Sequence, residues 1–145
     1  VKYLMGKDPL VLWDGVFELK YLENRGAAFG MLQGRQGFFF LIAAAVILAV
    51  LWAVYRMPAR KRYLPLMGSL FLLVSGAVGN MIDRLTQKYV VDFLYFKLID
   101  FPIFNVADCY VVIATFSLIL LFFFFYSDEE LEFLSFKGAK KESGR

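Results

Sequence analysis

Two aspartates stand in apolar stretches of the chain, where a charged side chain is energetically costly. Asp92 is the one charged residue of YVVDFLYF, and Asp108 is the one charged residue between Phe101 and Tyr126. Placing a charge in hydrocarbon costs about 2.5–3.5 kcal/mol on insertion scales, so an intramembrane acid is a functional candidate by default. Two close carboxylates cannot both ionise easily and can share one proton, as in aspartic proteases. The sequence therefore predicts that Asp92 and Asp108 form an acid–base pair.

The segment FNVAD suggests how the two roles divide. A helix that starts at Asn105 would favour the ionised form of Asp108, because the helix N-terminus carries partial positive charge. We therefore expect Asp108 to act as the initial base and Asp92 as the acid. A structural interpretation is equally open on spacing alone, because Asn105 and Asp108 also fit an N-cap residue with an acid at the third helical position.

Asp83 and Arg84 follow the second apolar stretch in GNMIDR and form a third group of candidates. They could simply mark the water interface, or Arg84 could orient a carboxylate or a backbone carbonyl through a forked hydrogen bond. The chain has no histidine and only Cys109, which excludes His-dependent Ser or Cys triads, the HExxH zinc motif and an internal disulfide. No metal and no organic cofactor are predicted.

The elements that must position these residues are membrane-spanning helices. The chain is 60% hydrophobic, well above the roughly 45–50% of soluble domains. Residues 38–55, 63–82 and 101–126 are each long enough to cross about 30 Å of hydrocarbon as a helix. We predict a membrane all-α bundle with three visible transmembrane helices, in a single membrane-embedded domain of residues 1–145.

Charge sets the expected orientation of the bundle. Arg56–Tyr63 holds four basic residues and no acid, so the positive-inside rule places this connector in the cytoplasm. The tail 127–145 is then cytoplasmic as well, with a short helix expected to end at Gly138. Residues 1–37 would lie outside. An odd number of spans leaves Val1 outside too, so we expect a further span, a signal anchor or a cleaved signal peptide to precede it.

Residues 1–37 are mixed in polarity. The alternation in GVFELKYLEN has period 2, which indicates a half-buried strand, and several glycines indicate turns. We predict a small extracytoplasmic β element on the membrane surface. A nucleic-acid partner is not expected, because the basic residues cluster only in one short connector and in the tail.

Four motifs together resemble one known family. ENRGAAFG at 23–30, GAVGNMIDR at 76–84, VVDF at 90–93 and FNVAD at 104–108 occur in the order and approximate spacing of lipoprotein signal peptidase, the type II signal peptidase of bacteria. The resemblance implies a four-span aspartic protease with a small β-cradle. Its first span, with an Asp-Gln pair near the outer end, is expected before residue 1. The resemblance implies that Asp92 and Asp108 are catalytic and are supported by Asn24, Asn80, Asp83, Arg84 and Asn105.

The resemblance also implies a substrate and a location. Such an enzyme cleaves prolipoproteins just before the diacylglyceryl-modified cysteine, as a multi-pass protein of the bacterial inner membrane with its active site near the outer leaflet. Its partners would be these prolipoproteins and membrane lipids, and we expect it to act as a monomer. The alternative is a proton- or cation-conducting membrane protein that uses the same aspartates.

Overall fold

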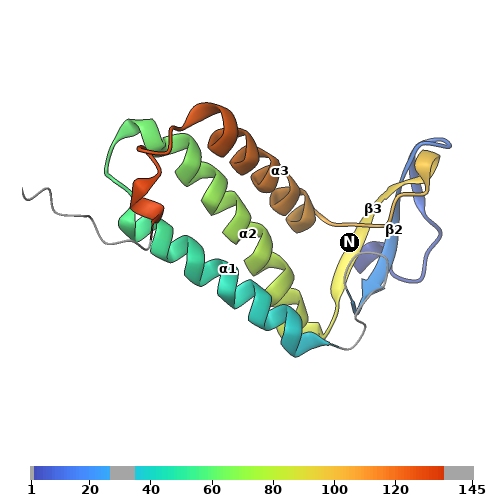
Figure 1. Cartoon of the computed structure of the whole chain (residues 1–145). Coiled ribbons are helices and arrows are strands. Elements are labelled where there is room, and N and C mark those ends of the chain that lie inside the picture. Colours follow the sequence, from blue (N-terminus) through green and yellow to red (C-terminus); the bar gives the residue numbers. More distant parts are fainter. Residues whose placement is uncertain (1, 27–34, 136–145) are drawn as a thin grey trace, which may run out of the picture.

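The computed structural model describes residues 2–26 and 35–135, which form three long helices and a small sheet (Figure 1). The helices are α1 (Gln36–Arg56), α2 (Leu64–Gln87) and α3 (Val106–Leu120), and α3 continues into a π-helical turn at Leu121–Phe125. Three segments are long and apolar enough to cross a membrane: Gly37–Arg56, Lys61–Gln87 and Val106–Phe125. The predicted membrane bundle of three helices with a small β element is confirmed.

Proline residues separate α1 from α2. Met57 adopts an extended conformation (φ −66°, ψ 129°), as expected for a residue before proline, and α1 therefore ends at Arg56. Pro65 lies in the first turn of α2, where its missing N–H costs nothing. At the other end, Lys88 takes a left-handed conformation (φ 69°) and donates its N–H to Arg84 O. The helix thus extends five residues past residue 82, the predicted end of this span.

The third helix begins later than the sequence suggested. We placed the start of this span at Phe101, but α3 begins at Val106 and residues 101–105 are not helical. Phe104 instead pairs with Leu94, with N–H to O distances of 3.0 and 2.8 Å in the two directions. The preceding segment is therefore tied to the sheet, and the predicted start is corrected to Val106.

The sheet has three antiparallel strands, β1 (Leu10–Trp13), β2 (Phe17–Asn24) and β3 (Val90–Phe96), in that order. The predicted strand in GVFELKYLEN is confirmed as β2, whereas β3 was not predicted. The register shifts between Leu19 and Leu22, after which Asn24 pairs with Val90. Figure 1 shows the sheet at the end of the bundle where α2 ends and α3 begins. Short 3₁₀ helices are Lys2–Leu4, Lys61–Tyr63, Lys97–Ile99 and Glu132–Leu134.

Helix α2 lies between α1 and α3 (Figure 1). Its contact with α3 is closest at Gly76, where a Cβ atom would lie 2.5 Å from Ala107 O and 2.7 Å from Val111 Cγ2. Small residues allow this close backbone approach in membrane bundles. Many large apolar side chains, including Phe116 and Phe123, point outward, which suits contact with lipid.

The opposite end of the bundle is closed by the segment after α3. Arg62 donates to Glu130 (2.8 Å), Tyr63 OH donates to Glu130 O (2.8 Å), and the Tyr63 and Tyr126 rings stack 5.6 Å apart. Ser127 caps this segment, since its Oγ accepts the Glu130 N–H at 3.3 Å. Within residues 127–135 the tail forms a 3₁₀ helix at Glu132–Leu134, and the expected helix end at Gly138 lies outside the described residues.

The close approach at Gly76 predicts a packing defect in the Gly76→Ala variant. The added methyl group meets backbone atoms of α3, so the helices must separate, at a cost of about 1–3 kcal/mol in the free energy of unfolding. Gly68→Ala is the matched control, because a Cβ there has no neighbour within 4 Å. Thermal unfolding in detergent, followed by circular dichroism, should show a lower midpoint for Gly76→Ala alone. Equal midpoints for the two variants would contradict the contact.

Candidate active site

Asp92 is the most deeply buried acid of the described residues, at 1% exposure. Strand β3 carries it to the edge of the bundle, where both carboxylate oxygens accept hydrogen bonds from amides. Asn24 Nδ2, at the end of β2, donates to Oδ2 at 2.8 Å, and Asn105 Nδ2 donates to Oδ1 at 2.7 Å. The β2–β3 pairing creates the first of these contacts, because Asn24 lies in the strand beside Asp92.

Asp108 lies in the first turn of α3. Its Oδ2 accepts the Asn105 N–H at 3.2 Å, and its own N–H donates to Asn105 Oδ1 at 3.0 Å, which completes a capping box. The predicted cap is therefore confirmed. The second carboxylate oxygen, Oδ1, accepts a hydrogen bond from Asn80 Nδ2 at 2.7 Å. Asp108 thus has a capping role and a contact with α2 at the same time.

Two asparagines connect the two acids. Asn105 Nδ2 donates both to Asp92 Oδ1 and, at 3.0 Å, to Asn80 Oδ1, while Asn80 Nδ2 donates to Asp108. The chain of contacts therefore runs from Asp92 through Asn105 and Asn80 to Asp108. Because each amide supplies both donors and an acceptor, it can hold two carboxylates near each other without adding a charge.

A cavity of about 140 Å³ opens beside this network. Both aspartates line it, and its other walls come from the ends of β2, β3 and α2 and from the chain before α3: Asn24, Asn80, Arg84, Val90, Phe101, Pro102, Ile103 and Phe104. This volume exceeds the share of liquid volume taken by one water, about 30 Å³. The cavity is therefore large enough to hold a water molecule beside the two carboxylates.

Burial changes the proton affinity of Asp92. The pKa of Asp92 is raised to about 6, chiefly by removal from water and also by the negative charge of Asp108. The hydrogen bonds from Asn24 and Asn105 and the charge of Arg84 act in the opposite direction. The net effect favours the neutral acid at Asp92 well above the pH at which an exposed aspartate ionises.

Arg84 lines the same cavity but bonds to backbone carbonyls rather than to a carboxylate. Its Nη2 donates to Gly26 O at 3.1 Å, its Nη1 donates to Asn80 O at 3.4 Å, and its guanidinium lies 4.6 Å from the Phe39 ring centre. Among the described residues no ion pair joins it to Asp92 or Asp108. Arg84 therefore connects the end of β2 to α1 and α2.

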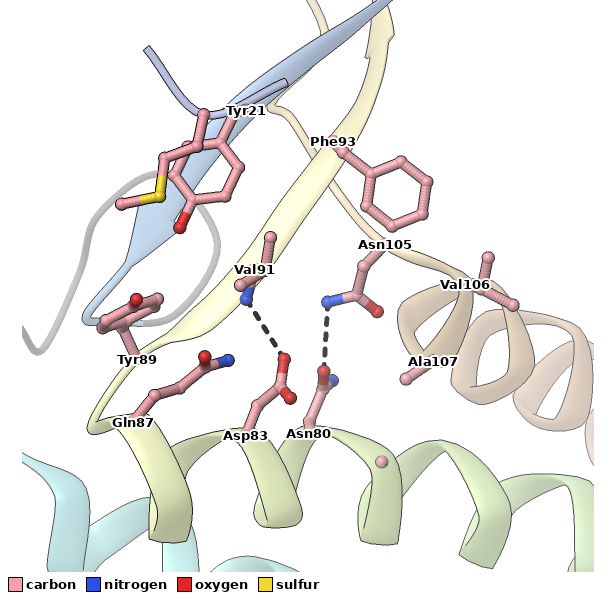
Figure 2. Close-up of a pocket in the computed structure, with 12 residues that line it drawn as sticks. Tyr21, Asn80, Asp83, Gln87, Tyr89, Val91, Phe93, Asn105, Val106 and Ala107 are labelled. Carbon is pink, nitrogen blue, oxygen red and sulfur yellow. Dashed lines mark hydrogen bonds between the residues drawn. The ribbon is translucent and has the colours of Figure 1, made fainter. Parts of the chain in front are cut away.

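Asp83 is the one sequence-predicted site residue that the structure turns away from the pair. Its Oδ2 accepts the Val91 N–H at 3.2 Å (Figure 2). Both residues line a separate cavity of about 650 Å³. Tyr21 and Tyr89 also line this cavity, and a hydrogen bond between them raises the pKa of Tyr21 to about 12. Of the residues that the structure describes, Asn80 alone borders both cavities. The contact of Asp83 is thus with the β3 backbone, which it helps to hold on α2.

Sequence reasoning did not anticipate the strand that carries Asp92 or the wall formed by residues 101–104. The β-branched and aromatic residues of VVDFLYF, together with the period 2 of the facing strand, were a usable signal for β3. No comparable pattern indicated the wall, because Phe101 and Phe104 fit the start of an apolar helix as well as they fit an extended segment.

Comparison with known proteins assigns the chain to a family. The sequence profile of signal peptidase (SPase) II matches residues 1–124. A lipoprotein signal peptidase of Streptococcus thermophilus is 46% identical over 107 residues, which cover 74% of this chain and 69% of the relative. One of Clostridium tetani is 42% identical over 119 residues, covering 80% of this chain and 74% of the relative.

Solved structures agree with the sequence comparison. A bacterial membrane enzyme solved at 2.3 Å resolution superposes with a TM-score of 0.71 at 32% identity, covering 79% of this chain and 70% of that chain. Another, solved at 1.9 Å resolution, gives a TM-score of 0.68 at 31% identity, over 80% of this chain and 75% of that chain. The chain therefore belongs to the signal peptidase II family of lipoprotein signal peptidases.

Proposed function

We propose that this protein is an aspartic endopeptidase in which Asp92 and Asp108 are the catalytic pair. The observation that carries the proposal is the shared network, in which two amides join both carboxylates beside one cavity. A purely structural use of Asp108 as a cap would not require Asp92, which lies in another element and is almost fully buried. Retaining a buried acid is costly unless it has a function or a strong partner.

The two environments support different roles for the two acids. Burial keeps Asp92 protonated to higher pH, whereas Asp108 lies at the positive N-terminal end of α3 and accepts the Asn105 N–H. In the proposed reaction Asp108 takes a proton from water as the water oxygen adds to the carbonyl carbon, and Asp92 protonates the carbonyl oxygen. As the C–N bond breaks, Asp108 returns its proton to the leaving nitrogen and the product hydroxyl returns one to Asp92.

The supporting residues hold this geometry. Asn24 and Asn105 donate to Asp92, and Asn80 donates to Asp108, so these amides fix the direction of each carboxylate. Arg84 ties β2 to the helices, and Asp83 ties β3 to α2 through the Val91 N–H. All seven residues come together within one copy of the chain.

The substrates are inferred from the relatives, which are named lipoprotein signal peptidases. We infer that this chain removes signal peptides from prolipoproteins, with cleavage just before the diacylglyceryl-modified cysteine. The basic connector Arg56–Tyr63 favours the cytoplasmic side. Strand β3 and the start of α3, which carry the two aspartates, lie at the opposite end of the helices (Figure 1). This arrangement supports an active site near the outer leaflet of the inner membrane.

The geometry gives less support to proton or cation conduction. A relay would need polar groups through the depth of the membrane. The acids of the three spans, Asp83 and Asp108, instead lie within the last turns of α2 and the first turn of α3, at one end of the bundle. Asp92 lies in the sheet at that same end.

The proposed pair predicts that Asp92→Asn and Asp108→Asn each abolish cleavage. An amide can neither take up nor release the proton, and loss of acid–base catalysis typically lowers rates by about 10²–10⁴-fold. The measurement is cleavage of a lipidated prolipoprotein by purified protein in detergent, with folding checked by circular dichroism. Asp100→Asn is the control, since Asp100 is exposed and its carboxylate accepts a hydrogen bond from the Tyr95 hydroxyl (2.6 Å), away from the pair. Retained cleavage by either Asp92→Asn or Asp108→Asn would contradict the proposal.

A shared proton also predicts a bell-shaped dependence of kcat/KM on pH. Activity falls as Asp92 loses its proton, and burial places this limb near pH 6 instead of near pH 4. The measurement is the initial cleavage rate at low substrate concentration between pH 3 and pH 9. A profile without two opposing limbs would argue against one shared proton.

The Asn24→Ala variant should shift the high-pH limb of the profile, where activity falls, to higher pH. The Asn24 hydrogen bond lowers the pKa of Asp92, so removing it raises that pKa further and shifts the limb to higher pH. The Arg25→Gln variant serves as the control, because Arg25 is exposed and pairs with Glu23 rather than with the dyad. A limb that stays in place, or moves to lower pH, would contradict the assignment of Asp92 as the acid.

A further inference from the structure

A pocket of about 420 Å³ lies at the end of the bundle opposite the aspartates. It is formed where α1, the basic connector and α2 meet, and its rim holds the cations Arg60 and Lys61. The rest of its lining is apolar or aromatic: Val54, Met57, Pro58, Ala59, Tyr63, Leu64 and Met67. The site proposed for peptide cleavage makes no use of this pocket.

The four cations of the connector have different partners. Arg62 is paired with Glu130 at 2.8 Å, and Arg56 lies over the Trp52 ring, 5.6 Å from its centre. Arg60 and Lys61 are exposed and have no ion pair among the described residues. Two positive charges on the rim of the pocket are therefore available to an anion.

The floor of the pocket suits an aliphatic chain. Val54 and Met57 come from the end of α1, and Leu64 and Met67 come from the first turns of α2. Both helices belong to segments long and apolar enough to span the membrane, so the pocket lies where a span meets the polar headgroup region. An occupant with an anionic head and an apolar tail would match both parts of the lining.

We propose that this pocket binds the headgroup of an anionic phospholipid, with one acyl chain on the apolar floor. Arg60 and Lys61 contact the phosphate, and the positive N-terminal end of α2 adds to the attraction. A soluble anion would leave the apolar floor without a partner. A zwitterionic lipid would place its own cation beside the two basic side chains.

The test compares lipids that differ only in headgroup. The purified full chain in detergent is titrated with phosphatidylglycerol or phosphatidylcholine carrying the same acyl chains, and bound lipid is counted by native mass spectrometry. Each cation near an anionic headgroup contributes roughly fivefold in affinity, so phosphatidylglycerol should bind on the order of 25-fold more tightly. Glycerol 1-phosphate, which carries the headgroup chemistry without acyl chains, should bind far more weakly.

The Arg60→Gln/Lys61→Gln double variant should lose the preference for phosphatidylglycerol. Lys7→Gln/Lys20→Gln is the matched control, because it removes the same charge from the β element and should keep the preference. If the double variant fails to fold, each single variant should weaken phosphatidylglycerol binding roughly fivefold. The proposal would be overturned by equal affinity for the two lipids, by an unchanged preference in the double variant, or by an equal loss of preference in the control. Tight binding of glycerol 1-phosphate would overturn the lipid assignment.

Discussion

The rest of the site depends on the hydrogen bonds of the Asn105 side chain. Its oxygen accepts the Asp108 N–H and so begins α3, while its nitrogen donates to Asp92 in the sheet and to Asn80 on α2. Asn105 is only 6% exposed, so water cannot replace these partners. One amide therefore fixes where a membrane helix starts, how it meets its neighbour and where the sheet is attached.

This arrangement explains how carboxylates are held in apolar surroundings. Asp92 has lost nearly all contact with water, yet neutral amides rather than a cation satisfy its oxygens. A direct ion pair with Arg84 would hold Asp92 ionised, whereas amides leave its pKa raised to about 6. The contacts of Arg84 with backbone carbonyls keep its charge close enough to influence the acid without pairing with it.

Local pattern was sufficient to predict the helices and much of the candidate site. The length and apolarity of three stretches define membrane helices, because hydrocarbon leaves an isolated segment no other way to satisfy its backbone. Period 2 in GVFELKYLEN identified β2, and the spacing from Asn105 to Asp108 identified the cap. Asp83, Arg84, Asp92 and Asp108 were identified from residue types and spacing, whereas Asn24 and Asn80 were implied only by the resemblance to lipoprotein signal peptidase.

Contacts between distant segments were decided only by the tertiary structure. Strand β3 pairs with β2 across more than sixty residues, and a register shift brings Asn24 beside Asp92. The same pairing turns Asp83 toward a separate cavity, although the sequence grouped it with the other acids. Composition and spacing determined which side chains could do chemistry, whereas strand register and helix ends determined which of them meet. A tight hairpin turn can fix register locally, but β2 and β3 are far apart in the chain, so their register depends on long-range pairing.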